Sequence, residues 1–375
     1  MIRLGCRKAL NPMVVGKAPA AQRPARIDND WRIAVYGPVR DGDKLPGLQV
    51  ALAISALSIV YFHSWAALDR FPKGTSFQLP ILTNYGWLGV DLFFALTGFV
   101  IGLVITKPGF NPRDFLIGRA ARLYPLWLVT LTLFALLSIA WRGPTETETL
   151  GYFLHSASLI ETKQFPYYDI GWSLQHEVVF YALAALIVPL FGVIGLLLLI
   201  AASSATYGIE TPWYIANLAQ YHAEFLAGLV ACLCRRHLLR LGAVAPLMIG
   251  SALVIAFYRI YGGRPFLPVA LFFLVIGFAN MASSAATRPL EILGDASYSI
   301  YLLHPLVFIA AKSATHIVSF PLWMQEPIRY GCIVVTLALS LLSWRYFEAP
   351  IIRAVRSLAR KRELTADSTA GLAAR

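Results

Sequence analysis

Long apolar segments follow one another through most of this chain, and few polar residues interrupt them. Most approach the roughly 20 residues that a helix needs to cross a bilayer. They lie at 48–67, 86–106, 121–141, 173–190, 192–208, 213–234, 244–260, 266–283, 298–316 and 328–347. The strands of a membrane barrel would instead alternate apolar and polar residues. The pattern therefore predicts an all-α fold, a polytopic transmembrane helical bundle of about ten spans.

The composition excludes an ordinary soluble enzyme. Hydrophobic residues make up 58% of the chain and charged residues 14%, against about 25% charged in a typical soluble domain. A net charge of +12 can indicate nucleic-acid binding, but the basic residues lie between the apolar segments, so we expect no nucleic-acid partner. The four cysteines show no metal-ligand spacing, and we expect no metal site.

The distribution of basic residues predicts the topology. The apolar stretch 173–208 is too long for one span and is expected to break near Pro189 and Gly192. Lys and Arg collect in short cytoplasmic loops. A hairpin at this break gives a strong excess of basic residues on one side, whereas the excess nearly vanishes without it. We therefore expect both termini to be cytoplasmic, with a disordered basic tail over 1–46, a membrane domain over 47–350 and a basic tail over 351–375.

Four ionisable side chains are predicted to lie at one depth, in the outer third of the membrane. Counting a rise of about 1.5 Å per residue brings His63, Asp91, His176 and Glu177 to a similar level. A histidine beside a carboxylate is the usual arrangement of a general base acting on a hydroxyl. Each residue alone can equally be a structural hydrogen-bonding group, but the coincidence in depth favours a reaction site.

The cytoplasmic side carries a different kind of site. Arg119 and Arg122 stand three residues apart at the start of a predicted span, an arrangement that suits phosphate. The alternative is a basic helix end that binds lipid headgroups. His304 belongs to the span expected at 298–316, which places it in the inner half of the membrane. A lone histidine there is more often a helix-packing group, so we expect it at most to line the substrate path.

Several segments, taken in order along the chain, resemble the membrane acyltransferase-3 family, the O-acetylases of O-antigen, exopolysaccharide and Nod-factor type. They are Leu48–Ser64, Gly89–Phe99, Arg119–Pro125, Trp172–Tyr181, Glu224–Gly228, Leu293–His304 and Arg345–Pro350. Each segment alone is weakly specific, but their order over residues 48 to 350 makes the resemblance fairly specific.

The resemblance implies an enzyme of the bacterial inner membrane that moves an acyl group, commonly acetyl, from cytoplasmic acyl-CoA to a hydroxyl of a saccharide or lipid-linked sugar. Acetyl-CoA would be a donor substrate and not a bound cofactor, and membrane lipids and polysaccharide biosynthesis machinery are the expected partners. His63 matches the family's catalytic histidine, with Asp91 and Glu177 expected to assist it. Arg119, Arg122 and Tyr124 are expected to hold the donor. Trp172, Ser173, His176 and His304 are expected to line the substrate path.

One position departs from the family. The family carries an arginine eleven residues before its histidine, and Leu52 stands there in this chain. The donor could then bind differently, Lys44 or Arg119 could substitute for the missing cation, or the chain could be a noncatalytic partner of a polysaccharide synthase. A transporter or flippase for a sugar-linked or anionic solute is a further alternative, although such folds usually contain two related halves, and the chain shows no such repeat.

Overall fold

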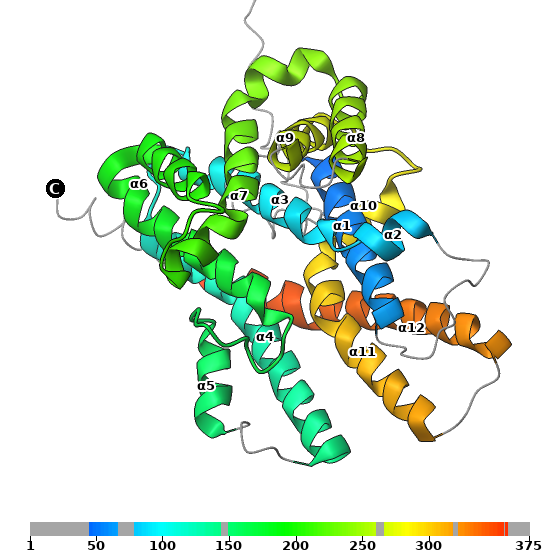
Figure 1. Ribbon diagram of the computed structural model, residues 1–375. Coiled ribbons are helices and arrows are strands. Elements are labelled where there is room, and N and C mark those ends of the chain that lie inside the picture. Colours follow the sequence, from blue (N-terminus) through cyan, green and yellow to red (C-terminus); the bar gives the residue numbers. More distant parts are fainter. Residues whose placement is uncertain are drawn as a thin grey trace, which may run out of the picture. The chain divides into compact units, whose positions relative to one another are not determined.

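The computed structural model describes residues 45–66, 79–143, 149–259, 266–317, 322–355 and 357–358. Within these ranges every regular element is helical, which confirms the predicted all-α class (Figure 1). The elements are α1 (Pro46–Ala66), α2 (Pro80–Tyr85), α3 (Leu88–Ile105), α4 (Pro112–Arg142), α5 (Leu150–Ser158), α6 (Gly171–Ala205), α7 (Trp213–Leu238), η2 (Leu239–Leu241), α8 (Val244–Arg259), α9 (Phe266–Ala279), α10 (Arg288–Asp295), α11 (Ser297–Ile317), α12 (Leu322–Ser343) and η3 (Trp344–Glu348). Nearly all of the predicted N-terminal tail, and most of the C-terminal one, lies outside the described residues.

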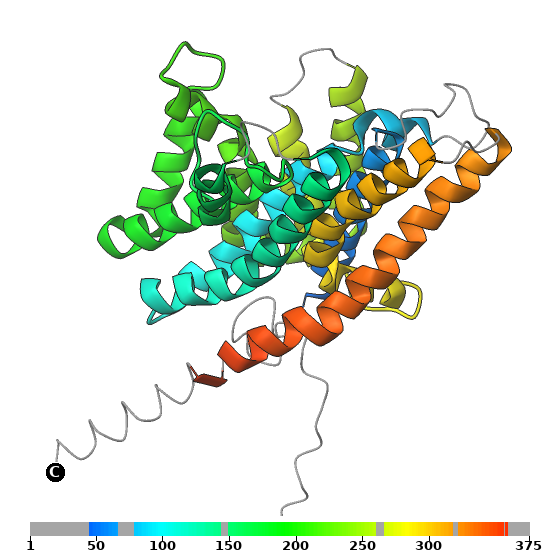
Figure 2. The same cartoon turned by 90° about the horizontal axis from the view of Figure 1, so that it is seen from below.

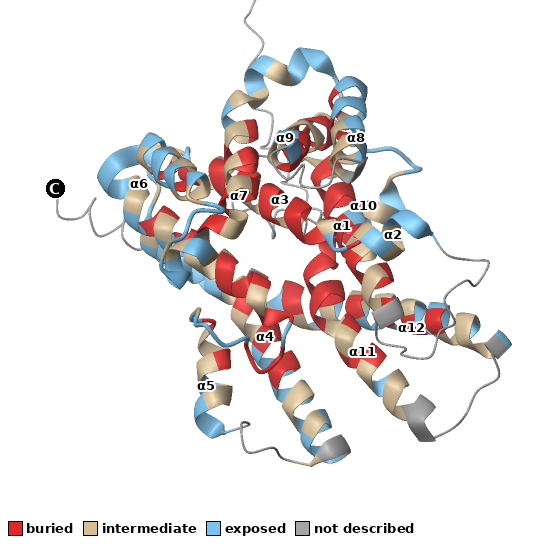
Figure 3. Cartoon of the chain, in the orientation of Figure 1, coloured by how far each residue is buried: buried red, intermediate tan, exposed pale blue. Residues whose placement is uncertain are grey.

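Several helices are long and apolar enough to cross a membrane. Five qualify alone, and a sixth candidate is the pair formed by α10 and α11, which is bent by 72°. The five are Pro46–Ser64, Leu88–Ile105, Pro112–Ala140, Gly171–Ala205 and Trp323–Val355, and the shorter helices Val244–Phe257 and Phe266–Ala279 are also apolar. Figure 3 shows exposed residues along the outer helices. Many of the exposed residues are large and apolar, as expected of surfaces that face lipid. The fold is that of a membrane protein, while the count of ten spans and the orientation of the termini stay predictions.

Helix α6 reverses direction at Gly192. This glycine has φ 68° and ψ −175°, outside the helical region, and Pro189 removes a backbone donor one turn earlier. His176 lies before this break and Ser203 after it, yet both contact adjacent residues of α7. The His176 ring lies 4.9 Å from that of Tyr221, and Ser203 hydrogen-bonds His222. A straight helix would separate His176 from Ser203 by about 40 Å. The predicted break between residues 189 and 192 is therefore confirmed.

Helix α1 is surrounded by other helices. It packs against α3, α9, α10, α11 and α12. Residues on several of its faces are fully buried, including Ala51, Ala56, Ile59 and Val60. Figure 2 shows α11 and α12 lying side by side. Because α1 is enclosed in this way, the side chains near its end at residue 63 point into protein, where a binding cavity can form.

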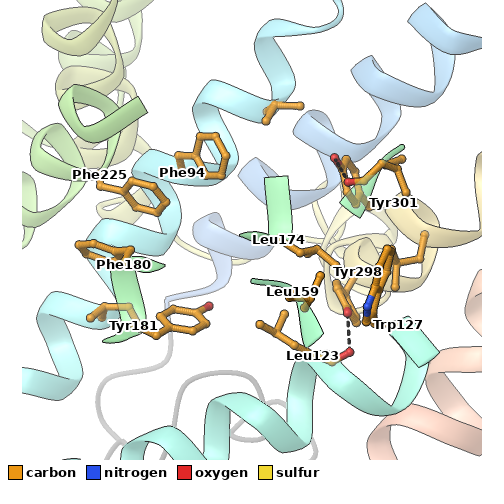
Figure 4. Packing of buried hydrophobic residues seen from close by; sticks show 14 of the residues in the cluster. Phe94, Leu123, Trp127, Leu159, Leu174, Phe180, Tyr181, Phe225, Tyr298 and Tyr301 are labelled. Carbon is orange, nitrogen blue, oxygen red and sulfur yellow. Dashed lines mark hydrogen bonds between the residues drawn. The ribbon is translucent and has the colours of Figure 1, made fainter. Parts of the chain in front are cut away.

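Helices α3 and α7 touch backbone to backbone. A Cβ atom on Gly228 would lie 1.8 Å from the carbonyl oxygen of Ala95, and one on Gly98 would lie 2.1 Å from that of Phe225. The Phe225 ring in turn stacks on Phe180 of α6, with ring centroids 4.3 Å apart (Figure 4). These glycines let three helices share one packed core beside the cavities described next.

Candidate active site

A cavity of about 520 Å³ lies where α1, α3, α4, α6, α7 and α11 meet. Its volume falls within the range of about 300–1,000 Å³ that is usual for small-molecule sites. His63, Asp91 and Asp169 supply polar atoms, and the remaining lining is largely aromatic. The aromatic residues include Trp87, Phe134, Tyr168, Trp172, Tyr221 and Tyr301. An aromatic cavity with a few polar groups is suited to an uncharged, ring-shaped ligand with hydroxyl groups.

The imidazole of His63 is hydrogen-bonded to a second imidazole, that of His304. His63 Nδ1 lies 2.7 Å from His304 Nε2, and the two rings are nearly parallel, with 7° between their planes and 4.9 Å between centroids. His304 is fully buried. The prediction that His304 lies at a different depth from His63 is therefore wrong. The span that carries His304 begins with α10, whose Gly294 packs against Gln49 near the start of α1, and ten residues further on the chain is level with His63.

A second, smaller cavity of about 80 Å³ adjoins the first, because Val90 and Tyr301 line both. The hydroxyl of Tyr301 lies 2.6 Å from that of Ser173 in this shared wall. The polar residues of the smaller cavity are Thr97, Arg122, Ser173 and Glu177. A histidine and a guanidinium therefore occupy neighbouring compartments with a tyrosine between them.

Arg122 keeps unused hydrogen-bonding capacity. Its guanidinium carbon lies 5.8 Å from the centroid of the Tyr298 ring, and its Nη1 atom is buried without a hydrogen bond to the described residues. A buried N–H donor that lacks an acceptor favours a ligand with an anionic or carbonyl oxygen, which would supply the missing hydrogen bond. Leu52, which replaces the family's arginine, lines the same cavity. The missing cation would thus have stood beside Arg122. Lys44 lies outside the described residues.

Glu177 belongs to the smaller cavity, so its predicted place beside His63 is wrong. One of its carboxylate oxygens accepts hydrogen bonds from Thr97 Oγ1, at 3.1 Å, and from the hydroxyl of Tyr181. The reason is helical geometry: Glu177 lies four residues after Ser173 and shares its face of α6. Asp91, in contrast, does line the cavity of His63 as predicted.

The other residues predicted to hold the donor lie further from the cavities. The guanidinium of Arg119 stacks on Phe115 and Tyr181, at 5.4 and 5.7 Å from the ring centroids. The hydroxyl of Tyr124 donates to the carbonyl of Ser158, at 2.9 Å. Arg119 thus supports the tyrosine that holds Glu177, and Tyr124 joins α4 to the end of α5.

Among the residues predicted to line the substrate path, Trp172 lines the larger cavity and Ser173 the smaller one. His176 points away, toward the loop between α5 and α6, where its Nδ1 lies 3.3 Å from Glu161 Oε1. The same oxygen accepts a hydrogen bond from Asn217. Burial raises the pKa of Glu161 to about 7.

Two charged residues of the site were missed from the sequence. Asp169 lines the larger cavity from the loop before α6, and burial raises its pKa. Its position three residues before Trp172, next to the aromatic pair Tyr167 and Tyr168, was the available signal.

Arg329 of α12 is the second, and it is fully buried. Its Nη1 donates to Ser64 Oγ at 3.2 Å, and its guanidinium lies 4.9 Å from the Tyr61 ring centroid. Its Nε and Nη2 donate to Glu326. Arg329 therefore holds the turn of α1 that carries His63.

Comparisons with known proteins show the family to which the chain belongs. The acyltransferase domain of the acyltransferase-3 family matches residues 46–345. The exopolysaccharide production protein ExoZ of Rhizobium meliloti strain 1021 is 29% identical over 318 residues, covering 77% of this chain and 94% of ExoZ. The putative peptidoglycan O-acetyltransferase YrhL of Bacillus subtilis strain 168 is 25% identical over 400 aligned positions, covering 84% of this chain and 56% of YrhL. No solved structure matches significantly. Because the family domain spans most of the chain, the protein belongs to the acyltransferase-3 family and is an acyltransferase.

Proposed function

We propose that this protein transfers an acetyl group from acetyl-CoA, bound from the cytoplasmic side, to a hydroxyl of a saccharide or lipid-linked sugar that enters from the opposite side of the membrane. The observation that carries the proposal is the pair of adjoining cavities, one with His63 and one with Arg122, that share Val90 and Tyr301. The relatives support the substrate class, since one is described by exopolysaccharide production and the other as a putative O-acetyltransferase.

The acceptor sugar is assigned to the larger cavity. A sugar ring would lie against Trp87 and Trp172, and its hydroxyls would find Asp91 and Asp169 as acceptors. His63 would take the proton of the reacting hydroxyl as its oxygen bonds to the thioester carbonyl carbon. The C–S bond then breaks, and the proton passes from the imidazolium to the departing CoA thiolate. The products are the acetylated sugar and free CoA, and the reaction needs no further reactant.

The donor is assigned to the side of the smaller cavity. A volume of about 80 Å³ accepts a narrow chain such as the end of the pantetheine arm, but not a nucleotide. The thioester would reach His63 by passing Tyr301, while the CoA phosphates stay outside, on the Arg122 side. Arg122 would supply the cation that the family places at position 52, because both residues line this cavity.

Arg122→Gln is expected to weaken donor binding. Loss of a charge-assisted hydrogen bond, about 1.5–3 kcal/mol, should raise the KM for acetyl-CoA about 10- to 100-fold, with a smaller effect on the KM for the acceptor. Initial rates measured over a range of acetyl-CoA concentrations test this. Arg113→Gln is the matched control, because Arg113 is exposed on the first turn of the same helix. An unchanged KM in Arg122→Gln would remove this residue from the donor site.

The decisive experiment compares cells with and without the gene. Mass spectrometry of the exopolysaccharide and of lipid-linked saccharides should show a species that lacks one acetyl group in the deletion strain, restored by the wild-type gene. The acceptor fraction found in this way then serves with acetyl-CoA as substrate for the purified protein. Glycans of unchanged mass, together with uptake or export of a sugar-linked solute by the purified protein in vesicles, would instead establish the transport function.

A further inference from the structure

The contacts of the two imidazoles define where their hydrogens lie. His304 Nδ1 is 3.2 Å from the carbonyl oxygen of Ile300. A carbonyl oxygen only accepts, so His304 Nδ1 carries the hydrogen, and in the neutral ring Nε2 keeps the lone pair. His63 Nδ1 lies 2.7 Å from that Nε2, so His63 must donate from Nδ1. The lone pair of neutral His63 is therefore on Nε2.

We propose that His304 is a positioning residue for acyl transfer, which holds the His63 ring in place and fixes the tautomer whose Nε2 takes the acceptor proton. The proposal rests on the function proposed above, in which His63 is the base. It replaces the carboxylate partner expected from the sequence with an uncharged one. A histidine whose other nitrogen is held by a hydrogen bond has a defined tautomer and ring orientation, as in many catalytic and metal sites.

The surroundings of His304 make it a rigid partner. The side chain is fully buried, and its ring lies 6.0 Å from both Tyr301 and Phe308. Pro305 follows directly, and proline has no backbone N–H to give to the helix. The His304 ring reaches back to the carbonyl of Ile300, about one helical turn earlier.

An uncharged partner also suits the reaction. When His63 accepts a proton on Nε2, its Nδ1–H becomes a stronger donor, and the lone pair of His304 Nε2 is already in place to receive it. The positive charge on the His63 ring is thus stabilised by a neutral acceptor, and His304 itself adds no charge that would have to be buried. His304 would thus act through His63 and not on the substrate.

Variants that differ in reach test this role. In His304→Gln the amide oxygen can occupy the place of Nε2 and accept from His63, whereas in His304→Asn the shorter side chain reaches only the Ile300 side. We expect His304→Asn and His304→Leu to lower kcat about 10²-fold with little change in either KM, and His304→Gln to retain activity within about tenfold of the wild type. The assay uses full-length protein in lipid nanodiscs, labelled acetyl-CoA and the acceptor fraction from the deletion strain.

The outcomes separate the two proposals. If the wild type transfers no acetyl group, the proposed function fails. If the wild type is active and His63→Ala is not, a His304→Asn variant as active as the wild type would overturn the positioning role alone. Equal loss in the Asn and Gln variants, or a loss expressed mainly in KM, would also overturn it, because a purely structural role does not distinguish the reach of the two amides. An active His63→Ala would refute the inference together with the identity of the base. The comparison of His304→Asn with His304→Gln does not depend on His304→Leu, so it remains valid even if the leucine variant fails to fold.

Discussion

Replacing His63 with alanine is expected to lower the rate of acetyl transfer by about 10²- to 10⁴-fold, the usual contribution of a positioned general base. His63 lines the larger cavity, and its Nδ1 is bonded to His304, so its Nε2 is the imidazole atom with a free lone pair. The loss should appear in kcat, because the aromatic walls that would hold the acceptor are unchanged. Initial rates with acetyl-CoA and the acceptor fraction measure it.

His237→Ala is the matched control for this variant. His237 is exposed at the end of α7 and lines neither cavity; the cavity residue of the same helix, Tyr221, lies about 24 Å away along the helix axis. The His237→Ala variant should transfer acetyl groups at the wild-type rate. Near-normal product from His63→Ala, in protein that accumulates normally in the membrane, would show that another group accepts the proton.

Gly228→Ala is expected to leave little folded protein in the membrane. The added Cβ would lie 1.8 Å from the carbonyl oxygen of Ala95, so α3 and α7 would have to separate. Overpacking usually costs about 1–3 kcal/mol when side chains can move aside. Here the obstacle is backbone, and the cost should exceed that range. The amount of protein in purified membranes and its melting temperature in detergent would report the effect.

Gly331→Ala provides the matched comparison. Gly331 also lies within a helix, α12, but a Cβ there meets nothing within 4 Å. Alanine favours a helix by roughly 1 kcal/mol over glycine, so this variant should be as stable as the wild type or slightly more so. Equal stability of the two alanine variants would contradict the close approach of α3 and α7.

The sequence was sufficient for features that depend on local pattern. Continuous apolar runs predicted an all-helical membrane protein, and Pro189 with Gly192 predicted the reversal within α6. His63 and Asp91 were predicted to lie at one depth and do line one cavity. The depth of a residue follows from the rise of the helix. The break follows from proline, which lacks a backbone N–H, and from glycine, which lacks a side chain, so both can be predicted from the local sequence.

Features that depend on contacts between distant segments could not be predicted in the same way. To predict that His63 pairs with His304, one would need to know that α10 packs against the start of α1 and leads directly into α11, which carries His304. Glu177 lines the smaller cavity and not that of His63, because the depth of a residue along a helix does not determine the direction in which its side chain points. Arg329 was missed, since nothing near it in the sequence indicates Tyr61 and Ser64 as its partners.

The position of Arg329 has a consequence for the order in which the enzyme becomes active. Tyr61 and Ser64 lie on either side of His63, and both contact the guanidinium of Arg329, which stands 265 positions after Ser64. During synthesis, α1 is made long before α12, so the turn that carries His63 lacks its anchor until α12 has been inserted and has packed. Chains that lack α12 are therefore expected to be inactive in the bilayer.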